Sequence, residues 1–148
     1  MDNTQQLIHD HLQNTEVMQL ATVRDGKPWC STVHFYADDA LNVYWCSALE
    51  TRHSKELQDD NSAAIAVAVQ IPWPVIGVQM EGTAGLVKDA DEIAKVMSAY
   101  AEKLHRDSEW AARVVRGEDE KKLYCFTPQL AVLFDPGNKE NARREWRP

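Results

Sequence analysis

The sequence predicts a mainly β fold, a small closed or partly closed antiparallel barrel of about six strands with helices inserted between some of them. Three observations support this prediction: β-rich segments follow one another across short turns, helical segments do not alternate with every strand, and the strand of residues 63–69 is apolar on both faces. A doubly wound parallel sheet is disfavoured because it needs a helix between successive strands. Closure of the sheet removes the exposed edges that such apolar strands would otherwise present.

The first part of the chain predicts one helix and then a three-stranded meander. Residues 2–14 carry apolar side chains at helical spacing, as a surface helix packed on one side does. Residues 17–23 (VMQLATV) are rich in β-formers, an Asp-Gly turn signal follows in RDGKP, and residues 29–37 (WCSTVHFYA) continue as a strand. A second turn in ADDA leads to a third strand, residues 41–47 (LNVYWCS).

The middle of the chain predicts a short helix, two more strands and a rigid loop between those strands. Thr51 is placed to cap the helix, and Leu57 is its single inward-facing apolar side chain. Residues 63–69 (AAIAVAV) are apolar on both faces, as in a strand covered on both sides, and residues 71–77 (IPWPVIG) hold two prolines in a loop. In the next strand, GVQMEGTAGLV, the two glycines within the pattern predict a bulge or a close approach of another segment.

The last third of the chain predicts two helices and the closing strands. Residues 89–105 form the clearest helix, with acidic residues at its start, basic residues near its end and an apolar stripe that faces the core. A shorter helix starts at Ser108 and ends at Gly117, and LYCFTPQLAVLFD supplies the last strands. The basic tail, residues 139–147, is predicted to be a solvated, partly ordered end.

Composition excludes several classes of function. The chain has 148 residues, of which 44% are hydrophobic and 26% charged, so we expect one soluble domain over residues 1–148. The net charge of −7 opposes nucleic-acid binding, no apolar run approaches the ~18 residues of a membrane span, and the N-terminus lacks the features of a secretory signal. We therefore expect a cytoplasmic protein that binds neither nucleic acid nor membrane.

The three cysteines, Cys30, Cys46 and Cys125, are odd in number and form no CxxC motif. This pattern argues against a disulfide framework and against a structural zinc site. We expect all three to be core thiols, and we expect no metal site.

Residues 50–57 (ETRHSKEL) begin a helix whose first charges have the wrong sign. The N-terminus of a helix carries a partial positive charge and favours Asp or Glu, yet Arg52, His53 and Lys55 stand there. A phosphate bound at this N-terminus would remove the conflict, because free backbone N–H groups, two hydroxyl side chains and a guanidinium group all suit an anion. An exposed turn with solvated cations is the alternative that the spacing leaves open.

The neighbouring strands give this anion site a context. Residues 29–37 carry polar atoms on both faces, which a purely structural hairpin seldom does. The segments STVHFYADDALNVYWCSALETRHSKEL, NSAAIAV and IPWPVIGVQMEGTA resemble the pyridoxamine 5′-phosphate oxidase-like family of FMN-binding split barrels, over residues 16–88. The resemblance implies an antiparallel six-stranded split β-barrel with flanking helices, FMN as the cofactor, and a homodimer with FMN at the subunit interface.

The resemblance also implies which residues contact FMN. Thr51, Arg52 and His53 match the Ser or Thr, the Arg and the Lys that hold the flavin phosphate, and Lys55 is close enough to replace His53. Gln79 lies on the strand that reaches the FMN of the neighbouring subunit. The complete implied set, with a strand beside the flavin ring and a strand-end pair, is Ser31, Thr32, Val33, Cys46, Ser47, Thr51, Arg52, His53, Ser54, Lys55 and Gln79.

The resemblance covers the cofactor site but not the substrate site of true pyridoxamine phosphate oxidases. Their C-terminal Arg-x-His segment has no counterpart in NARREWRP, so oxidation of pyridoxamine phosphate is not expected. The implied function is an FMN-dependent oxidoreductase of an unidentified small substrate, with NADH or NADPH as candidate electron donors and hydride exchange at the flavin N5. The alternative is a non-catalytic protein or sensor that binds flavin, haem or deazaflavin.

No catalytic residue is assigned from the sequence. His34 lies on the strand expected beside the flavin ring and would be able to exchange a proton there, although a structural histidine is the simpler explanation. Glu81, near Gln79, is equally ambiguous. No Ser-His-Asp, Cys-His or paired-carboxylate arrangement is needed, because the flavin supplies the reactive atom.

Overall fold

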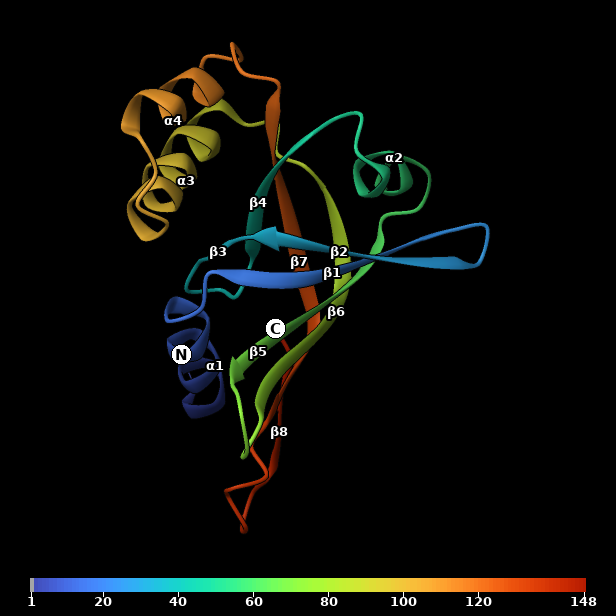
Figure 1. The fold of residues 1–148 in the computed structure, drawn as a ribbon, viewed down its shortest axis with the longest axis vertical. Coiled ribbons are helices and arrows are strands. Elements are labelled where there is room, and N and C mark those ends of the chain that lie inside the picture. Colours follow the sequence, from blue (N-terminus) through green and yellow to red (C-terminus); the bar gives the residue numbers. More distant parts are fainter. Residues whose placement is uncertain (1) are drawn as a thin grey trace.

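One curled antiparallel sheet forms the body of the structure, a computed structural model that describes residues 2–148. Its strands lie in the order β2-β1-β5-β6-β7-β4-β3, and β8 pairs with β7 (Figure 1). The strands are β1 (Val17–Arg24), β2 (Lys27–His34), β3 (Tyr36–Ala37), β4 (Val43–Ala48), β5 (Ser62–Gln70), β6 (Ile76–Leu86), β7 (Lys121–Phe134) and β8 (Arg143–Trp146). The predicted mainly β, split-barrel class is confirmed, and within residues 2–148 the sheet has eight strands where six were expected.

Helices flank this sheet at the positions that the sequence predicts. They are α1 (Asn3–Gln13), α2 (Arg52–Asp59), α3 (Ala90–Lys103) and α4 (Ser108–Val115). Each begins at a side chain that accepts a hydrogen bond from a backbone N–H of the first turn, namely Asp2, Thr51, Asp89 and Asp107. Among residues 2–148, no helix is long and apolar enough to cross a membrane.

Phe35 divides the predicted strand of residues 29–37 into β2 and β3. Its side chain is fully buried, and its backbone N–H donates to Glu16 O at 3.1 Å. Lys103 of α3 holds this break, since its Nζ donates to Phe35 O at 3.1 Å and to Leu12 O at 2.9 Å. β2 therefore pairs with β1 at one end of the sheet and β3 pairs with β4 at the other, so the predicted three-stranded meander is wrong. β2 and β3 lie at opposite ends of the strand order, yet Phe35 alone connects them in the chain. The sheet must therefore curl, and β2 and β4 face each other without pairing.

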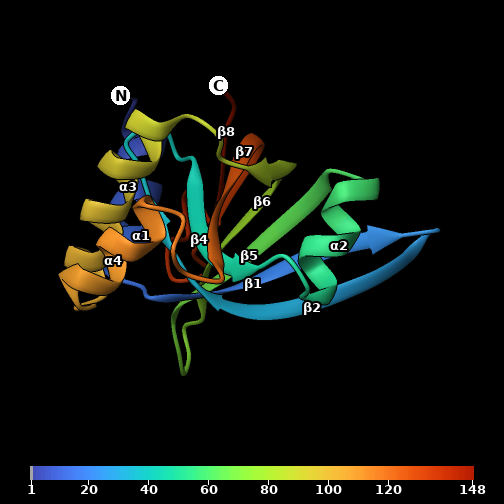
Figure 2. The ribbon, with the colours of Figure 1, turned by 90° about the horizontal axis from the view of Figure 1, so that it is seen from above.

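One hydrophobic cluster fills the inside of the curled sheet, and a second covers part of its outer face. The larger fills the inside of the curl, where Trp45 of β4 and Ile8 and Leu12 of α1 are fully buried. The smaller joins α3 and α4 to β4 and β7 through side chains such as Tyr44 and Met97. Figure 2 shows α1, α3 and α4 grouped at one side of the sheet and α2 alone beside the β1–β2 hairpin at the other. α2 is therefore the helix that covers the facing ends of β2 and β4.

β6 contains the bulge that its glycine pattern predicts. The register between β6 and β7 shifts between Glu81 and Gly82. A Cβ atom on Gly82 would lie 2.1 Å from the carbonyl oxygen of Thr127 on β7, so no side chain fits there. A Cβ atom on Gly85, in the same strand, would meet nothing within 4 Å. The predicted close approach is thus confirmed, and Gly82 is the residue that requires it.

Two expectations about the surface are wrong. Cys30 is exposed, because β2 is an end strand and this position points away from the core, whereas Cys46 and Cys125 are partly buried against α3 and α4. The basic tail is more ordered than expected: residues 143–146 form β8 against β7, and Trp146 is buried in the main core. The strand pairing supplies hydrogen bonds that the charged composition of the tail does not reveal.

Candidate functional site

α2 follows β4 after a short turn, and Thr51 caps it as predicted. The backbone of Thr51 is extended, and its hydroxyl oxygen accepts a hydrogen bond from Ser54 N at 3.3 Å. The Thr51 and Ser54 hydroxyl oxygens lie 2.6 Å apart, and Ser54 is only 1% exposed. Ser54 is therefore part of the cap. Among residues 2–148, the backbone N–H groups of Arg52 and His53 have no hydrogen-bond partner at this helix end.

His53 joins the two strands that face each other without pairing. Its Nε2 lies 2.7 Å from Ser47 Oγ on β4, and its Nδ1 lies 3.2 Å from Ser31 Oγ on β2. We call these three side chains the His53 bridge. Burial lowers the pKa of His53, the Lys121 charge lowers it further and Glu56 opposes the shift, so the imidazole is neutral near pH 7.

Arg52 lies over the Trp29 ring and pairs with a buried carboxylate. Its guanidinium carbon is 4.0 Å from the centre of the ring, and its Nε donates to Glu56 Oε2 at 3.2 Å. Glu56 is 1% exposed, and within residues 2–148 its second carboxylate oxygen has no hydrogen-bond partner. Neither Trp29 nor Glu56 was predicted as a site residue. The i,i+4 spacing of Arg52 and Glu56 was the available signal for the pair.

Of two further cations in this part of the molecule, Lys55 lies on the surface of α2 and Lys121 lies near His53. Lys55 Nζ pairs with Glu50 Oε2 at 3.2 Å on the surface. Lys121 is brought in by β7, because the β4–β7 pairing places it opposite Ala48. Its charge is near enough to lower the pKa of His53. Sequence reasoning missed Lys121, since a register between strands that are far apart in the chain leaves no local signal.

Other predicted residues lie elsewhere on the sheet. Cys46 faces α3, where its Sγ lies 3.6 Å from Met97 Sδ and burial raises the pKa of the thiol to about 12. Thr32 points to the outer face of β2, where its hydroxyl donates to Gln19 Oε1 at 2.7 Å, and Gln79 shares this outer face. The predicted residues that do meet around α2 are Ser31, Ser47, Thr51, Arg52, His53, Ser54 and Lys55, while Val33 packs against the core.

The outer face of the sheet carries a shallow cavity of about 420 Å³ between β1, β5, β6 and β7. Small and polar side chains line it, among them Gln19, Ala64, Ala66, Gln79 and Val132. Cross-strand pairing places Ala66 between Gln19 and Gln79. A second cavity of about 570 Å³ lies between α3 and α4 and contains none of the residues that meet around α2.

Comparison with known families agrees with this fold. The family model described as pyridoxamine 5′-phosphate oxidase matches residues 4–132, which is most of the chain. The chain belongs to this family. The family resemblance predicted from the sequence is therefore confirmed, and the matched segment of this pyridoxamine 5′-phosphate oxidase family member contains every predicted site residue. No curated protein sequence matches the chain.

Solved structures with the same fold carry several different descriptions. General Stress Protein 26 from Bacillus anthracis is 16% identical with a TM-score of 0.73, over 99% of this chain and 100% of that chain. The conserved hypothetical protein Rv2991 from Mycobacterium tuberculosis is 16% identical with a TM-score of 0.74, over 91% of this chain and 85% of that one. A heme binding protein from Mycobacterium smegmatis is 18% identical with a TM-score of 0.78, over 99% of this chain and 59% of that one. At these identities the likeness shows a shared fold and assigns no ligand.

Proposed function

We propose that this member of the pyridoxamine 5′-phosphate oxidase family binds FMN and uses it to oxidise or reduce a small molecule. The observation that carries the proposal is the set of donors around the start of α2: the Ser31 hydroxyl, two free backbone N–H groups, and the cations Arg52, Lys55 and Lys121. Such a set suits the phosphate of FMN. Proteins of this family are often dimeric flavin binders.

Arg52 is prepared for an anion before one arrives. Trp29 and Glu56 hold its guanidinium group in place, and the terminal N–H groups of Arg52 form no hydrogen bond within residues 2–148. Binding therefore costs little side-chain entropy. A net cationic cluster in a chain of net charge −7 is also favoured when a bound anion offsets its repulsion.

β2 offers a free edge to the flavin ring. It pairs with β1 on one side only, so alternate residues present their backbone N–H and C=O groups to the other side, which faces β4; among residues 31–33 this is Thr32. Backbone groups at this edge would orient the ring while α2 holds the phosphate. A bound flavin would supply hydride exchange at N5, and the chain would supply binding and orientation.

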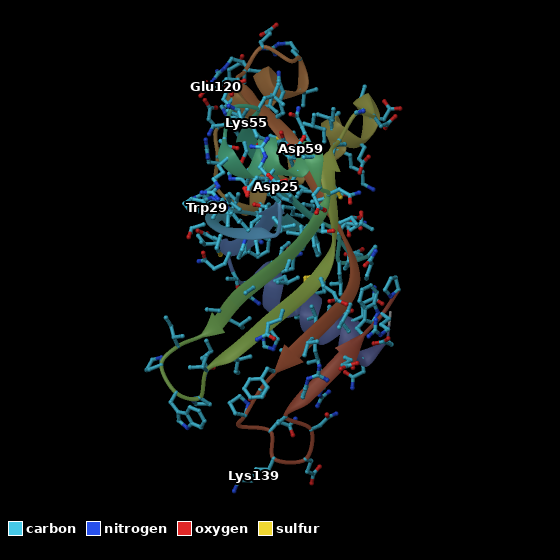
Figure 3. The ribbon with its side chains drawn as sticks, turned by 90° about the vertical axis from the view of Figure 1, so that its right-hand side faces the viewer. Asp25, Trp29, Lys55, Asp59, Glu120 and Lys139 are labelled. Atoms are coloured by element: carbon cyan, nitrogen blue, oxygen red, sulfur yellow. The ribbon has the colours of Figure 1, made fainter. Side chains whose placement is uncertain are left out.

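Pyridoxamine phosphate is not the substrate that we propose. The C-terminal segment forms β8 along β7, and Figure 3 shows Lys139, just before it, at the opposite end of the molecule from Lys55. Within one chain, this segment is therefore not placed to hold a second phosphate beside α2. We propose a different small substrate, with NADH or NADPH as the electron donor.

The outer face of β5 supports a homodimer. The sequence predicts a strand covered on both faces, yet Ala66 and Ala68 are exposed in the single chain. Small side chains in a row let two sheets approach closely, and a two-fold contact of this kind covers the same patch on both copies. We propose that a second copy covers this face, with Gln79 at the contact.

Ala66→Arg should convert the proposed dimer to a monomer. An arginine near the centre of a two-fold contact is buried once in each copy without an opposite charge, which opposes association. Light scattering after gel filtration measures the mass, which should fall by half. Ala94→Arg, on the exposed side of α3, is the matched control and should leave the mass unchanged. A monomeric wild-type protein would contradict the proposed dimer.

The absorption spectrum of the purified protein tests the cofactor. The two-banded spectrum of oxidised flavin is expected, and a colourless protein that takes up no added FMN would overturn the proposal. A Soret band would instead identify haem, although both ring nitrogens of His53 are already hydrogen-bonded and not free for iron. Reduction of the bound flavin by NADH or NADPH faster than that of free FMN distinguishes an enzyme from a binding protein or sensor.

A further inference from the structure

The hydrogen bonds of the His53 bridge depend on the charge of the imidazole. A neutral imidazole has one N–H donor and one acceptor nitrogen, so one of the two serine hydroxyls must donate its proton to the ring. A protonated imidazole has two N–H donors, so both serine oxygens accept, and the hydroxyl that had donated to the ring becomes free to donate elsewhere. Protonation of His53 therefore frees one neighbouring hydroxyl group as well as adding one charge.

A serine hydroxyl that no longer donates to the ring is able to donate to a bound anion. Ser31 is the more exposed of the two serines, and Ser47 is 4% exposed, so Ser31 is the direct donor to a ligand at the free edge of β2. A positive charge on His53 would stand at the first turn of α2, beside two free backbone N–H groups. The protonated bridge is thus the better anion site, whereas burial makes the neutral bridge the resting form.

The charged groups that face His53 come from two elements. α2 contributes Arg52 and the buried Glu56, and β7 contributes Lys121, whereas Lys55 lies at the surface in an ion pair with Glu50. β2 and β4 contribute the uncharged serines of the bridge. Cations outnumber carboxylates here, so an added phosphate has a large effect on the protonation of His53.

We propose that a phosphate binds at the start of α2 together with a proton, which His53 takes up. The proposal rests on the FMN-binding function proposed above, with the FMN phosphate as the anion. The anion stabilises the imidazolium directly, and the Ser31 hydroxyl, whose oxygen then accepts from the ring, donates to the anion. The binding energy of the phosphate is therefore coupled to pH through this chain's own residues.

The sign of the pH dependence follows from linkage. An anion that raises the pKa of His53 causes proton uptake between the free and the bound value, so FMN affinity falls as pH rises, by up to about tenfold per pH unit. Between about pH 7 and about pH 8.5 free FMN is already a dianion, because a phosphate monoester has its second pKa near about 6. In this window the proton comes from the protein side alone.

Isothermal titration calorimetry with FMN, in phosphate-free buffers of different ionisation enthalpy, measures the uptake. Near pH 7.5 we expect up to about one proton taken up per FMN. Riboflavin, which lacks the phosphate, should bind more weakly and take up none. The ring nitrogen-15 resonances of His53 give a second measurement, and with FMN they should move to the imidazolium position.

Variants separate His53 from the other histidines. His53→Lys carries its charge throughout this window, so it should bind FMN without proton uptake. His53→Gln keeps one donor and one acceptor but no charge, so it should bind FMN at least about tenfold more weakly, again without uptake. His11→Gln, on α1 and outside the proposed site, should keep both the affinity and the uptake of the wild type.

The possible results of these measurements test the proton coupling and the proposed FMN function separately. FMN binding without proton uptake, or uptake that persists in His53→Lys, overturns the coupling and leaves the proposed FMN function intact. Wild-type protein that binds no FMN overturns both. If neither His53 variant folds, the comparison of FMN with riboflavin on the wild type and the His53 resonances still decide the coupling.

Discussion

Arg52→Ala should weaken FMN binding by about 10- to 150-fold. A hydrogen bond between a guanidinium group and a phosphate contributes about 1.5–3 kcal/mol, and about 1.4 kcal/mol is a factor of ten. The effect is expected to be this large because Arg52 is held ready by Trp29 and Glu56. Titration of flavin fluorescence with the apo protein measures the change in Kd.

The same substitution should also lower the stability of the apo protein by about 1–3 kcal/mol, since the buried Glu56 loses its partner. The double variant Arg52→Ala with Glu56→Gln separates the two effects. A neutral amide at position 56 should restore stability, as measured by urea unfolding, while FMN affinity stays low. Recovery of wild-type affinity in the double variant would show that Arg52 acts only through Glu56 and does not hold the phosphate.

Gly82→Ala should destabilise the protein by about 3–5 kcal/mol. The new Cβ atom would lie 2.1 Å from the Thr127 carbonyl oxygen. This oxygen belongs to the backbone, so it cannot move away by a change of side-chain rotamer. β6 and β7 must separate at the bulge to relieve this clash, and the strand pairs beside it weaken. Urea unfolding should show a lower midpoint with an unchanged slope.

Gly85→Ala is the matched control for this prediction. It makes the same chemical change in the same strand, but its Cβ atom would meet nothing within 4 Å. Its stability should lie within about 0.5 kcal/mol of the wild type or slightly above it, because alanine restricts the unfolded chain more than glycine does. Equal stabilities of the Gly82→Ala and Gly85→Ala proteins would contradict the close approach of β6 to β7.

The roles within ETRHSKEL show how far local sequence reasoning reached. The cap at Thr51 and the helix after it were predicted correctly, because capping depends on residues a few positions apart. The sequence left His53 and Lys55 as alternatives for one role. In the structure His53 lies in the bridge between β2 and β4, whereas Lys55 lies at the surface with Glu50. The positions of these two side chains depend on β2 and β4, which the local pattern of residues 50–57 does not contain.

The face of each strand was harder to assign than its existence. Cys46 and Ser47 are neighbours in the sequence, so they point to opposite faces of β4, and of the two Ser47 reaches α2. The sequence did not show which face of residues 29–37 is the inner one; in the structure Ser31 lies on the side of His53, and the predicted end of the strand is wrong because Phe35 turns into the core. The alternation of side chains between the two faces of a strand follows from backbone geometry. The position at which a strand breaks depends on tertiary packing, here on the burial of the Phe35 side chain.

The sequence by itself determined the fold class, the family and the helix starts, since each depends on patterns within a few residues or on one run of motifs. The tertiary structure alone decided that His53 spans the facing strands, that Glu56 is buried beneath Arg52 and that Lys121 arrives from β7. These contacts join segments that are distant in the chain, and their register is set by the closure of the whole sheet. The chemistry of the site, and with it the charge of His53, is therefore a property of the closed sheet.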